Sequence, residues 1–410
     1  MSAPALIFRQ PALRLIFLAL LLLGAHNASV YPYQSLIAIE RIGLSKPAFA
    51  LVLVLASITA VTASVLFGIL GDQRGHRRRI ALVATVASLL GLLLMLCFPG
   101  KLSLILCHGI LLPIASSLYG QLFALARLAT PGSHSRDTVQ AALRSAMSIS
   151  FLAMLVFWTF GFAAQIDVMA IYLSASLASF GLVVLVYFNW PKDGTTEWAD
   201  QRSGLNFAQA FKEIAHPTIL LRLLLLGAIS ATGILYMVLI SLVFEASPIR
   251  DASDVALYVG LVAGWEVPCL LLLSRVAGRL RRATLLAVGG AVYTLHLLAL
   301  PMLCDSAWIW VMPLVAGIGG TAIISLPISY YQDLMHSRPG TAGAMLALQK
   351  LVSDVLGAAA FAIGTSLGGY ETVAVIGSAM ALIGGAGLLW VDRHHNLPAR
   401  QSSLPRSTRL

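Results

Sequence analysis

Long apolar stretches separated by short polar ones make up most of the chain. Each apolar stretch is about 20 residues or longer, enough for an α-helix to cross a hydrocarbon layer of about 30 Å. Such lengths exclude buried strands and the short alternating strands of an outer-membrane barrel. Breaks at proline, glycine and charge clusters predict twelve membrane helices, near residues 12–39, 47–71, 79–98, 102–126, 138–162, 167–190, 217–244, 253–275, 283–303, 307–331, 339–366 and 371–391. The pattern therefore predicts an all-α membrane protein.

A polar interval over residues 191–216 separates the first six predicted helices from the last six. We expect an N-terminal six-helix bundle over 1–190, a cytoplasmic linker loop over 191–216, a C-terminal six-helix bundle over 217–396 and a cytoplasmic tail over 397–410. The tripeptide His-Ser-Arg occurs at 134–136 and again at 336–338, before the fifth and the eleventh predicted helices. Its position at the same joint of each half favours an internal duplication, which is common in transporters.

Composition and charge agree with a membrane protein. The 410 residues are 59% hydrophobic and 11% charged, with a mean hydropathy of +0.87, whereas soluble domains are about 25% charged. The net charge of +10 could indicate nucleic-acid binding, but the basic residues are scattered among short loops. Only four of the 27 lysines and arginines fall on the side away from both predicted termini, namely Arg41, Lys46, Lys101 and Arg250. The positive-inside rule then predicts a multi-pass membrane protein with both termini in the cytoplasm.

A glycine-rich basic segment joins the second and third predicted helices. It reads GILGDQRGHRRR over residues 68–79 and contains Gly71, Asp72, Arg74, Gly75 and Arg77. Glycines permit a tight turn with close helix approach, and the carboxylate of Asp72 can pair with a helix N-terminus or an arginine. On their own, these residues also fit a generic basic turn on the cytoplasmic side.

This segment resembles the loop signature of the major facilitator superfamily. With this resemblance, we interpret the segment as a gate on the cytoplasmic side, and a generic basic turn is the alternative. Three further segments, FALAR at 123–127, GWEVP at 264–268 and YQDLM at 331–335, resemble the matching parts of bacterial sugar efflux transporters of the Set/Sot type. The resemblance implies two six-helix bundles around a central cavity, with alternating access to it. It also implies proton-driven export of small sugars or glycosides from the cytoplasm, by a multi-pass protein of the bacterial inner membrane. An exporter of drugs or other small metabolites is the alternative, and a membrane sensor that moves no ligand is a third.

Ionisable residues inside apolar helices are candidates for proton coupling, because burying a charge in a membrane is costly. Glu266 lies midway along the eighth predicted helix, beside Trp265 and without a basic residue one turn away. Lys350 and Asp354 are spaced i,i+4 on the eleventh and can pair on one face. We expect these three residues to couple transport to protons, although a structural carboxyl and a local ion pair are the alternatives. Arg144 in the fifth helix could donate to substrate or extend to the cytoplasmic surface.

Neutral polar residues suit a ligand rich in hydroxyl groups. Asn27, Tyr31 and Gln34 follow a helical spacing and predict one polar stripe along the first helix. Together with Arg144, the residues that could extend this substrate site are Gln121, Tyr236, Trp265 and Gln349. Hydrogen bonds between helices are the competing explanation for each of them. The same explanation is favoured over proton relay for the isolated histidines His26, His108 and His296.

The sequence contains no phosphate-binding loop, no paired catalytic carboxylates and no nucleophile constellation, so neither an enzyme nor ATP-driven transport is expected. No cofactor or metal is expected either. The expected partners are small sugars or glycosides, protons and the lipid bilayer, with no nucleic acid and no obligate protein partner.

Overall fold

The computed structural model describes residues 3–74, 76–130, 133–192, 216–276, 280–334 and 339–393. Some side chains near helix ends, including those of 71–74, 133–138 and 339–344, lie outside this description. Among the described residues there is no strand, and twelve helical spans are long and apolar enough to cross a membrane. The predicted all-α class and the number of spans are therefore confirmed, with ends that differ from the predicted ones by only a few residues.

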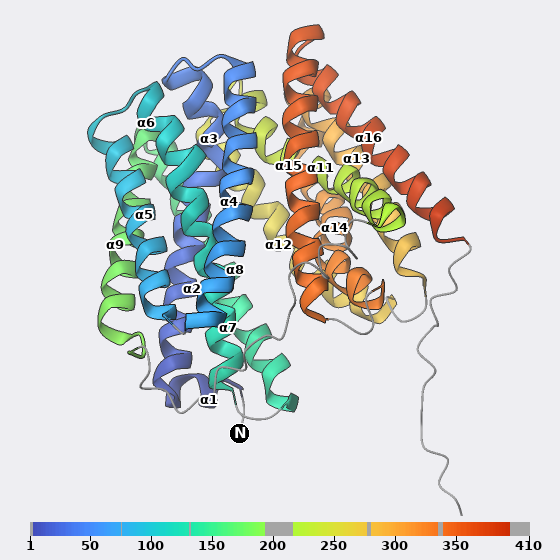
Figure 1. The fold of residues 1–410 in the computed structure, drawn as a ribbon. Coiled ribbons are helices and arrows are strands. Elements are labelled where there is room, and N and C mark those ends of the chain that lie inside the picture. Colours follow the sequence, from blue (N-terminus) through green and yellow to red (C-terminus); the bar gives the residue numbers. More distant parts are fainter. Residues whose placement is uncertain are drawn as a thin grey trace, which may run out of the picture.

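The first half of the molecule contains the first six spans, coloured blue to green in Figure 1. A short helix, α1 (Ala3–Arg9), precedes them. The spans are α2 (Pro11–Val30) continued by η1 (Tyr31–Tyr33), α3 (Gln34–Leu36) and η2 (Ile37–Arg41); α4 (Lys46–Arg74); α5 (Arg77–Cys97); α6 (Lys101–Leu106) continued by η3 (Cys107–Leu111) and α7 (Leu112–Ala129); α8 (Ser133–Ala163); and η4 (Val168–Ala170) continued by α9 (Ile171–Asn189).

The second half contains the other six spans, coloured yellow to red in Figure 1. They are α11 (Pro217–Glu245); α12 (Ala252–Val276); α13 (Arg282–Met302); η5 (Ala307–Val311) continued by α14 (Met312–Leu334); α15 (Pro339–Leu367); and α16 (Tyr370–Val391).

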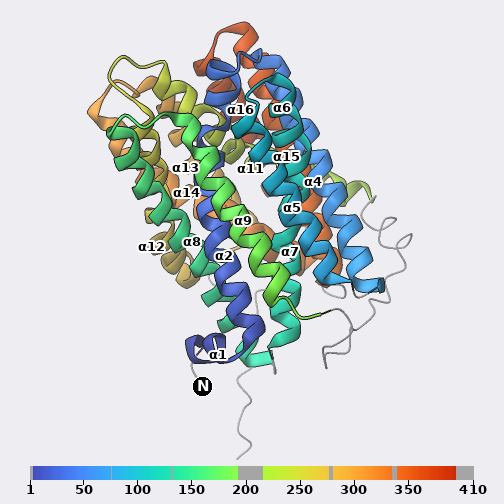
Figure 2. The same ribbon diagram turned by 90° about the vertical axis from the view of Figure 1, so that its left-hand side faces the viewer.

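The two halves repeat one packing pattern. The first span of the first half, α2, packs against the fifth (α8) and the sixth (α9), which lie beside it in Figure 2. The first span of the second half, α11, packs in the same way against α15 and α16. Similarly, α5 packs against α7 and α9, while its counterpart α13 packs against α14 and α16. The repeated pattern shows two six-helix bundles of the same design.

The halves meet along α4 with α15, along α8 with α12, and where η1 and α3 of the first span pack on α11; Figure 1 shows α15 beside α4. Because the chain crosses an even number of times, both ends lie on one side, here named the terminal side. Bonds between the halves lie toward the opposite side. Ser35 Oγ donates a hydrogen bond of 2.7 Å to the carbonyl of Val238, and the ring of Phe49 meets that of Phe361 edge-on at 6.1 Å.

Two buried apolar clusters show the same asymmetry. The larger one contains residues of both halves, among them Leu36, Phe49 and Leu239. The other contains residues of the first half alone, such as Leu13, Leu122 and residues near the end of α9. These lie at the terminal-side ends of their helices. The described apolar core is therefore shared between the halves toward the opposite side only.

A buried ion pair ties three helices of the second half together near the terminal side. Arg222 of α11 lies 2.9 Å from Asp392, which directly follows α16. Tyr330 of α14 donates a hydrogen bond of 2.9 Å to the same carboxylate and accepts one of 3.1 Å from Arg222. Both charged side chains are almost fully buried. Because every partner is charged or a strong donor, the cost of burial is offset within the cluster.

Glycines allow α14 to approach its neighbours closely. A Cβ atom at Gly319 would lie 2.7 Å from the carbonyl oxygen of Gly289 on α13, and one at Gly317 would lie 2.7 Å from the Cβ of Trp265 on α12. Small residues permit such close helix contact inside a membrane. Because α14 approaches both α12 and α13 so closely along this face, side chains of α12 and α13 come together in the interior of the second half.

Candidate functional site

Four polar residues from three helices meet where the halves join, and we call them the inter-half site: Tyr31, Ser57, Lys350 and Asp354. Lys350 Nζ lies 2.8 Å from Asp354 Oδ2, on the same face of α15 as the i,i+4 spacing predicts. Ser57 Oγ of α4 donates a hydrogen bond of 2.6 Å to the same oxygen. The carboxylate of Asp354 is thus held by both halves of the molecule.

The exposure of these residues differs strongly. The Lys350 side chain is 64% exposed, while that of Asp354 is 10% exposed. Tyr31 lies well inside the first span (Pro11–Arg41) and is still 42% exposed. Its phenol is within electrostatic range of Lys350 and Asp354 of the other half. Tyr31 and Lys350 therefore face the space between the halves rather than the interior of either bundle.

The first span is less regular than the predicted polar stripe requires. The α-helix α2 ends at Val30, a 3₁₀ turn runs from Tyr31 to Tyr33, and a π-helical segment follows α3. A 3₁₀ turn has fewer residues per turn than an α-helix and a π-helix has more, so the face along which residues align rotates. Tyr31 is exposed, but Asn27 and Gln34 are half-buried. Of the three stripe residues, only Tyr31 is seen to face the inter-half site.

Glu266 lies midway along α12, as predicted, and is half-buried. Its Oε1 atom borders the Cα of Gly320 on α14: a Cβ built there would lie 3.3 Å from this oxygen and 3.1 Å from Cε2 of Tyr293. Tyr236 of α11 is also within electrostatic range of the carboxyl. Among the described residues, no side chain makes an ion pair or hydrogen bond with it. Glu266 therefore enters the interior of the second half, next to two tyrosines.

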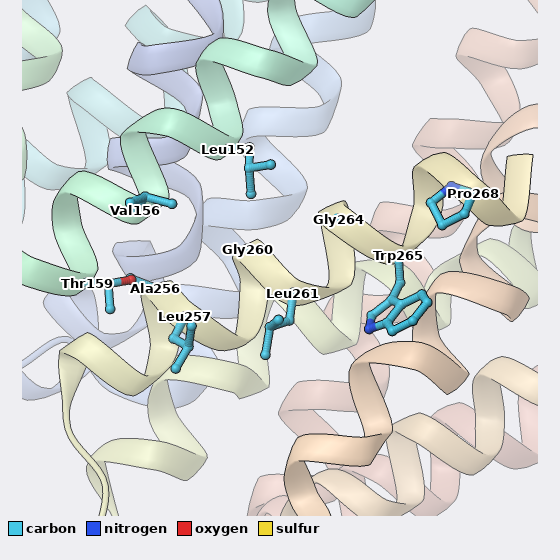
Figure 3. Close-up of a pocket in the computed structure, with 10 residues that line it drawn as sticks. All are labelled: Leu152, Val156, Thr159, Ala256, Leu257, Gly260, Leu261, Gly264, Trp265 and Pro268. Carbon is cyan, nitrogen blue, oxygen red and sulfur yellow. The ribbon is translucent and has the colours of Figure 1, made fainter.

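Trp265, the neighbour of Glu266, is 43% exposed and lies at the wall of an elongated groove of about 450 Å³ between α8 and α12. Figure 3 shows Trp265 and Pro268 at one end of this groove and Val156 and Thr159 at the other. The remaining lining residues are Leu152, Ala256, Leu257, Gly260, Leu261 and Gly264. The groove is almost wholly apolar, so the structure groups Trp265 with apolar side chains and not with the polar residues of the first span.

Gln121 and Arg144 lie in the first half, closer to the terminal side. Gln121 is buried; it accepts a hydrogen bond of 3.5 Å from Arg77 and donates one of 3.4 Å to the carbonyl of Phe67. It thereby links the end of α4, the start of α5 and α7. Arg144 is exposed, and its guanidinium lies 5.5 Å from the ring centre of Phe123, a cation–π distance.

Gln349 and Tyr236 are buried inside the second half. Gln349 Nε2 donates a hydrogen bond of 2.8 Å to Ser230 Oγ, from α15 to α11. This contact agrees with the alternative of a bond between helices. Tyr236 packs its ring against those of Tyr258, Tyr293 and His296.

The structure does not describe most side chains of the predicted gate. The backbone of Gly71, Asp72 and Arg74 continues α4, but their side chains are not described, and Gly75 falls outside the described residues. Arg77 begins α5. Of the five gate residues, the structure therefore describes the contacts of Arg77 alone, through its bond to Gln121.

Two of the three isolated histidines bond to other helices, as expected. His26 Nδ1 lies 3.1 Å from Ser179 Oγ, and His108 Nε2 lies 2.9 Å from Tyr172 Oη. His296 differs: neither of its ring nitrogens has a hydrogen-bond partner among the described residues.

Sequence reasoning did not identify Ser57 as a site residue. Hydroxyl groups in membrane helices commonly bond to carbonyls of their own helix, as Thr59 does to Leu55 in α4. Nothing in the spacing of Ser57 distinguishes it from such residues. Only the packing of α4 on α15 brings it to Asp354.

Two six-helix bundles that repeat one design, with a buried carboxylate held between them, define the chain as a multi-pass membrane protein of the transporter class. Residues 16–361 match the Major Facilitator Superfamily. The chain belongs to this superfamily of transporters.

Relatives and solved structures agree with this assignment. The chain is 24% identical over 395 residues to a Deinococcus radiodurans protein provisionally named a sugar efflux transporter, with 93% of this chain and 98% of the relative covered. Among solved structures, it resembles a variant of the nucleoside transporter NupG (14% identity, 93% and 100% of the chains covered, TM-score 0.77). It also resembles the peptide transporter POT in complex with sulfate (11%, 92% and 94%, 0.72) and a D-xylose-proton symporter (14%, 91% and 95%, 0.67). At these identities the structural likeness concerns the fold.

Proposed function

We propose that this transporter exports small sugars or glycosides from the cytoplasm by proton antiport, with access alternating between the two sides of the membrane. The observation that carries the proposal is the inter-half site, where charged and phenolic groups of both halves face one another inside the membrane. The full-length similarity to a protein named as a sugar efflux transporter supports sugar as the substrate. The abundance of basic residues on the terminal side supports an orientation with both termini in the cytoplasm. The similarity to a bacterial relative supports the bacterial inner membrane as the location.

The bundles are proposed to extend over residues 1–190 and 217–396, with a cytoplasmic linker at 191–216 and a tail at 397–410. Contacts between the halves lie toward the side opposite the termini. With the termini in the cytoplasm, this conformation is the one from which a cytoplasmic sugar would be loaded. Rocking of the halves about the inter-half site would then open the opposite side.

The predicted site residues take different roles in this proposal. Tyr31 and Lys350 offer a phenol and an ammonium group to sugar hydroxyls, and Asn27, Gln34 and Arg144 extend the site along the first half. Gln121 and Gln349 form hydrogen bonds within their own bundle, and the ring of Tyr236 packs on that of His296. These three residues are therefore proposed to hold in place the helices that carry the site. Glu266 and Asp354 are the proton-coupling carboxyls, with Lys350 as the partner of Asp354. Gly71, Asp72, Arg74, Gly75 and Arg77 form the gate.

Purified protein in liposomes tests the proposal. Uptake or efflux of labelled sugars and glycosides is measured with an imposed pH gradient, and sugar-for-sugar exchange is measured without one. Saturable sugar movement toward the more acidic side, opposite to the flow of protons down their gradient, supports proton antiport, whereas sugar movement toward the more alkaline side would indicate symport. Sugar movement that ignores the gradient contradicts proton coupling, and the absence of any sugar movement or exchange contradicts sugar as the substrate.

The apolar groove at Trp265 favours a second candidate, the export of drugs or other apolar metabolites. Its lining offers almost no partners for sugar hydroxyls, whereas apolar pockets of several hundred Å³ suit drug-sized ligands. A parallel panel of labelled cationic drugs separates the two candidates, because a drug exporter would move the drugs and leave the sugars.

A further inference from the structure

The interior of the second half contains a cluster of aromatic polar residues that no role so far explains. We name it the tyrosine–histidine cluster: Tyr236 of α11, Tyr258 of α12, and Tyr293 and His296 of α13. The His296 ring centre lies 4.8 Å from that of Tyr236, 5.1 Å from that of Tyr293 and 5.9 Å from that of Tyr258. Three phenols thus surround one imidazole.

Several polar atoms of this cluster lack partners. His296 is fully buried, yet neither ring nitrogen has a hydrogen-bond partner among the described residues, and the same holds for the buried hydroxyls of Tyr236 and Tyr258. Buried polar groups are normally hydrogen-bonded, often to ordered water. Four such atoms in one cluster indicate a place where small polar molecules, of which water is the smallest, bind inside the bundle.

The cluster extends from Glu266 toward the opposite side of the membrane. At one end, the carboxyl of Glu266 is within electrostatic range of Tyr236 and Tyr293. At the other end, Tyr258 is within electrostatic range of Cys304, which lies just after α13 on the opposite side. Tyr258 and Glu266 are eight positions apart on α12, which is about 12 Å at 1.5 Å per residue.

Charged groups gather where the cluster reaches the opposite side. Asp254, Asp305 and Arg250 are within electrostatic range of Cys304. Arg250 donates a hydrogen bond of 2.9 Å to the Cys304 carbonyl, and its guanidinium lies 5.2 Å from the ring centre of Trp310, which in turn packs on Tyr258. Surface carboxylates here can collect protons from the solution on the opposite side.

We propose that the tyrosine–histidine cluster binds buried water and relays protons between the opposite side and Glu266. A proton arriving on one ring nitrogen of His296 is matched by the release of a proton from the other nitrogen, so the imidazole returns to its neutral form and no other reactant is consumed. The hydroxyls of Tyr236, Tyr258 and Tyr293 orient the water on either side of the ring.

The surroundings of His296 fit this role. The titratable groups that face it are Tyr236 from α11, Tyr258 from α12 and Tyr293 on its own helix. No charged group of the described residues interacts electrostatically with its ring. A permanent neighbouring carboxylate would trap the proton on the imidazole, whereas neutral phenols let it pass.

This inference rests on Glu266 as the coupling carboxyl of the proposed function, so its first test does not depend on transport. Infrared spectroscopy of the protein in lipid follows deuteration of the Glu266 carboxyl after transfer to D₂O at low pD. The carboxyl band is identified by its loss in Glu266→Gln. In His296→Phe, which keeps an aromatic ring, we expect deuteration to slow by about a hundredfold, the low end of what a positioned proton-transfer group contributes.

Tyrosine-to-phenylalanine variants, which remove a single hydroxyl group, provide a second test in case His296→Phe does not fold. Tyr258→Phe should also slow deuteration. Tyr331→Phe should not: Tyr331 is a buried tyrosine near the terminal-side end of α14 whose hydroxyl likewise lacks a partner among the described residues, but it lies outside the cluster. Wild-type deuteration rates in both His296→Phe and Tyr258→Phe would overturn the relay.

Transport in liposomes gives the second readout. Because His296→Phe would lack the relay, it should lose sugar movement driven by a pH gradient but keep sugar-for-sugar exchange, which requires no proton release. If wild-type protein moves no sugar in response to pH, the proposed function fails, and the infrared comparison still decides the relay. Full pH-driven transport in His296→Phe contradicts the relay while leaving the proposed function in place.

Discussion

Ser57 and Asp354 are 297 positions apart in the chain, yet the hydroxyl of Ser57 donates a hydrogen bond of 2.6 Å to Oδ2 of Asp354. The same oxygen lies 2.8 Å from Lys350 Nζ. One oxygen atom therefore receives a partner from the other half and one from its own helix. Separation of α4 and α15 must break the first contact and leave the second in place.

Ser57→Ala is expected to shift the conformational equilibrium. Loss of one hydrogen bond between the halves weakens the closed opposite side by about 1 kcal/mol, or about fivefold in population, because Asp354 keeps Lys350 as a partner. Spin-label distances between Lys101 and Glu371, exposed residues at the opposite side, measure the shift. Thr59→Ala is the control, since Thr59 bonds within its own helix. Identical distance distributions in wild type and Ser57→Ala would contradict a latch.

Glu266→Gln is expected to abolish sugar movement driven by a pH gradient, because an amide cannot release a proton. Sugar-for-sugar exchange should persist at least in part, since exchange requires no proton release. Flux in liposomes under both conditions gives the comparison. A Gln variant that still concentrates sugar under a pH gradient would leave Asp354 or the histidines as the coupling residues.

Gly320→Ala is expected to disturb the same carboxyl through packing. The added methyl group would lie 3.1 Å from Tyr293 Cε2 and 3.3 Å from Glu266 Oε1, tighter than ordinary contacts, at a cost of about 1 kcal/mol or more. We expect weaker pH-driven flux and a lower thermal midpoint in detergent. Gly233→Ala in α11 is the matched control, because nothing lies within 4 Å of its added methyl. Equal flux and equal thermal midpoints in the two variants would show that a methyl group fits at position 320 without disturbing Glu266.

The two candidate sites for sugar, the inter-half site and the apolar groove, predict different effects of mutation. If sugar binds at the inter-half site, Tyr31→Phe and Asn27→Ala raise the half-saturating sugar concentration with little change in maximal rate, because they remove neutral hydrogen bonds. Trp265→Leu should then leave sugar affinity unchanged. The opposite result, with sugar affinity lost only in Trp265→Leu, would place the sugar in the apolar groove.

Asp72→Asn is expected to impair transport far more than folding, because the gate requires a carboxylate at the turn between α4 and α5. Expression in the membrane should match wild type while flux falls by about tenfold, the loss of roughly 1.4 kcal/mol from a charged contact. Wild-type flux from a well-expressed Asp72→Asn protein would remove the gate interpretation.

The spans could be predicted from sequence because length and apolarity alone define them. Contacts between distant helices could not. The i,i+4 spacing indicated the pair of Lys350 and Asp354, but the third partner, Ser57, depends on the packing of α4 against α15. The stripe on the first span was predicted from the spacing of a regular α-helix, and sequence spacing alone did not indicate the 3₁₀ turn at Tyr31–Tyr33.

The histidines illustrate the same limit. All three are isolated on apolar helices, so their sequence contexts look alike. The structure separates them, because His26 and His108 meet hydroxyl groups while His296 meets only rings and unpartnered hydroxyls. Spacing along one helix carries no information on which residue of another helix lies opposite.

The ion pair between Arg222 and Asp392 has a consequence for how the protein is made. Synthesis proceeds from the N-terminus, so α11 enters the membrane while its counter-ion, 170 positions later, does not yet exist. Arg222 is within two turns of the start of α11, and there its long side chain can reach the polar surface. Only the arrival of α16 lets the guanidinium turn inward and become buried. A nascent chain that stops before α16 would therefore contain this arginine without the carboxylate that neutralises it in the finished protein.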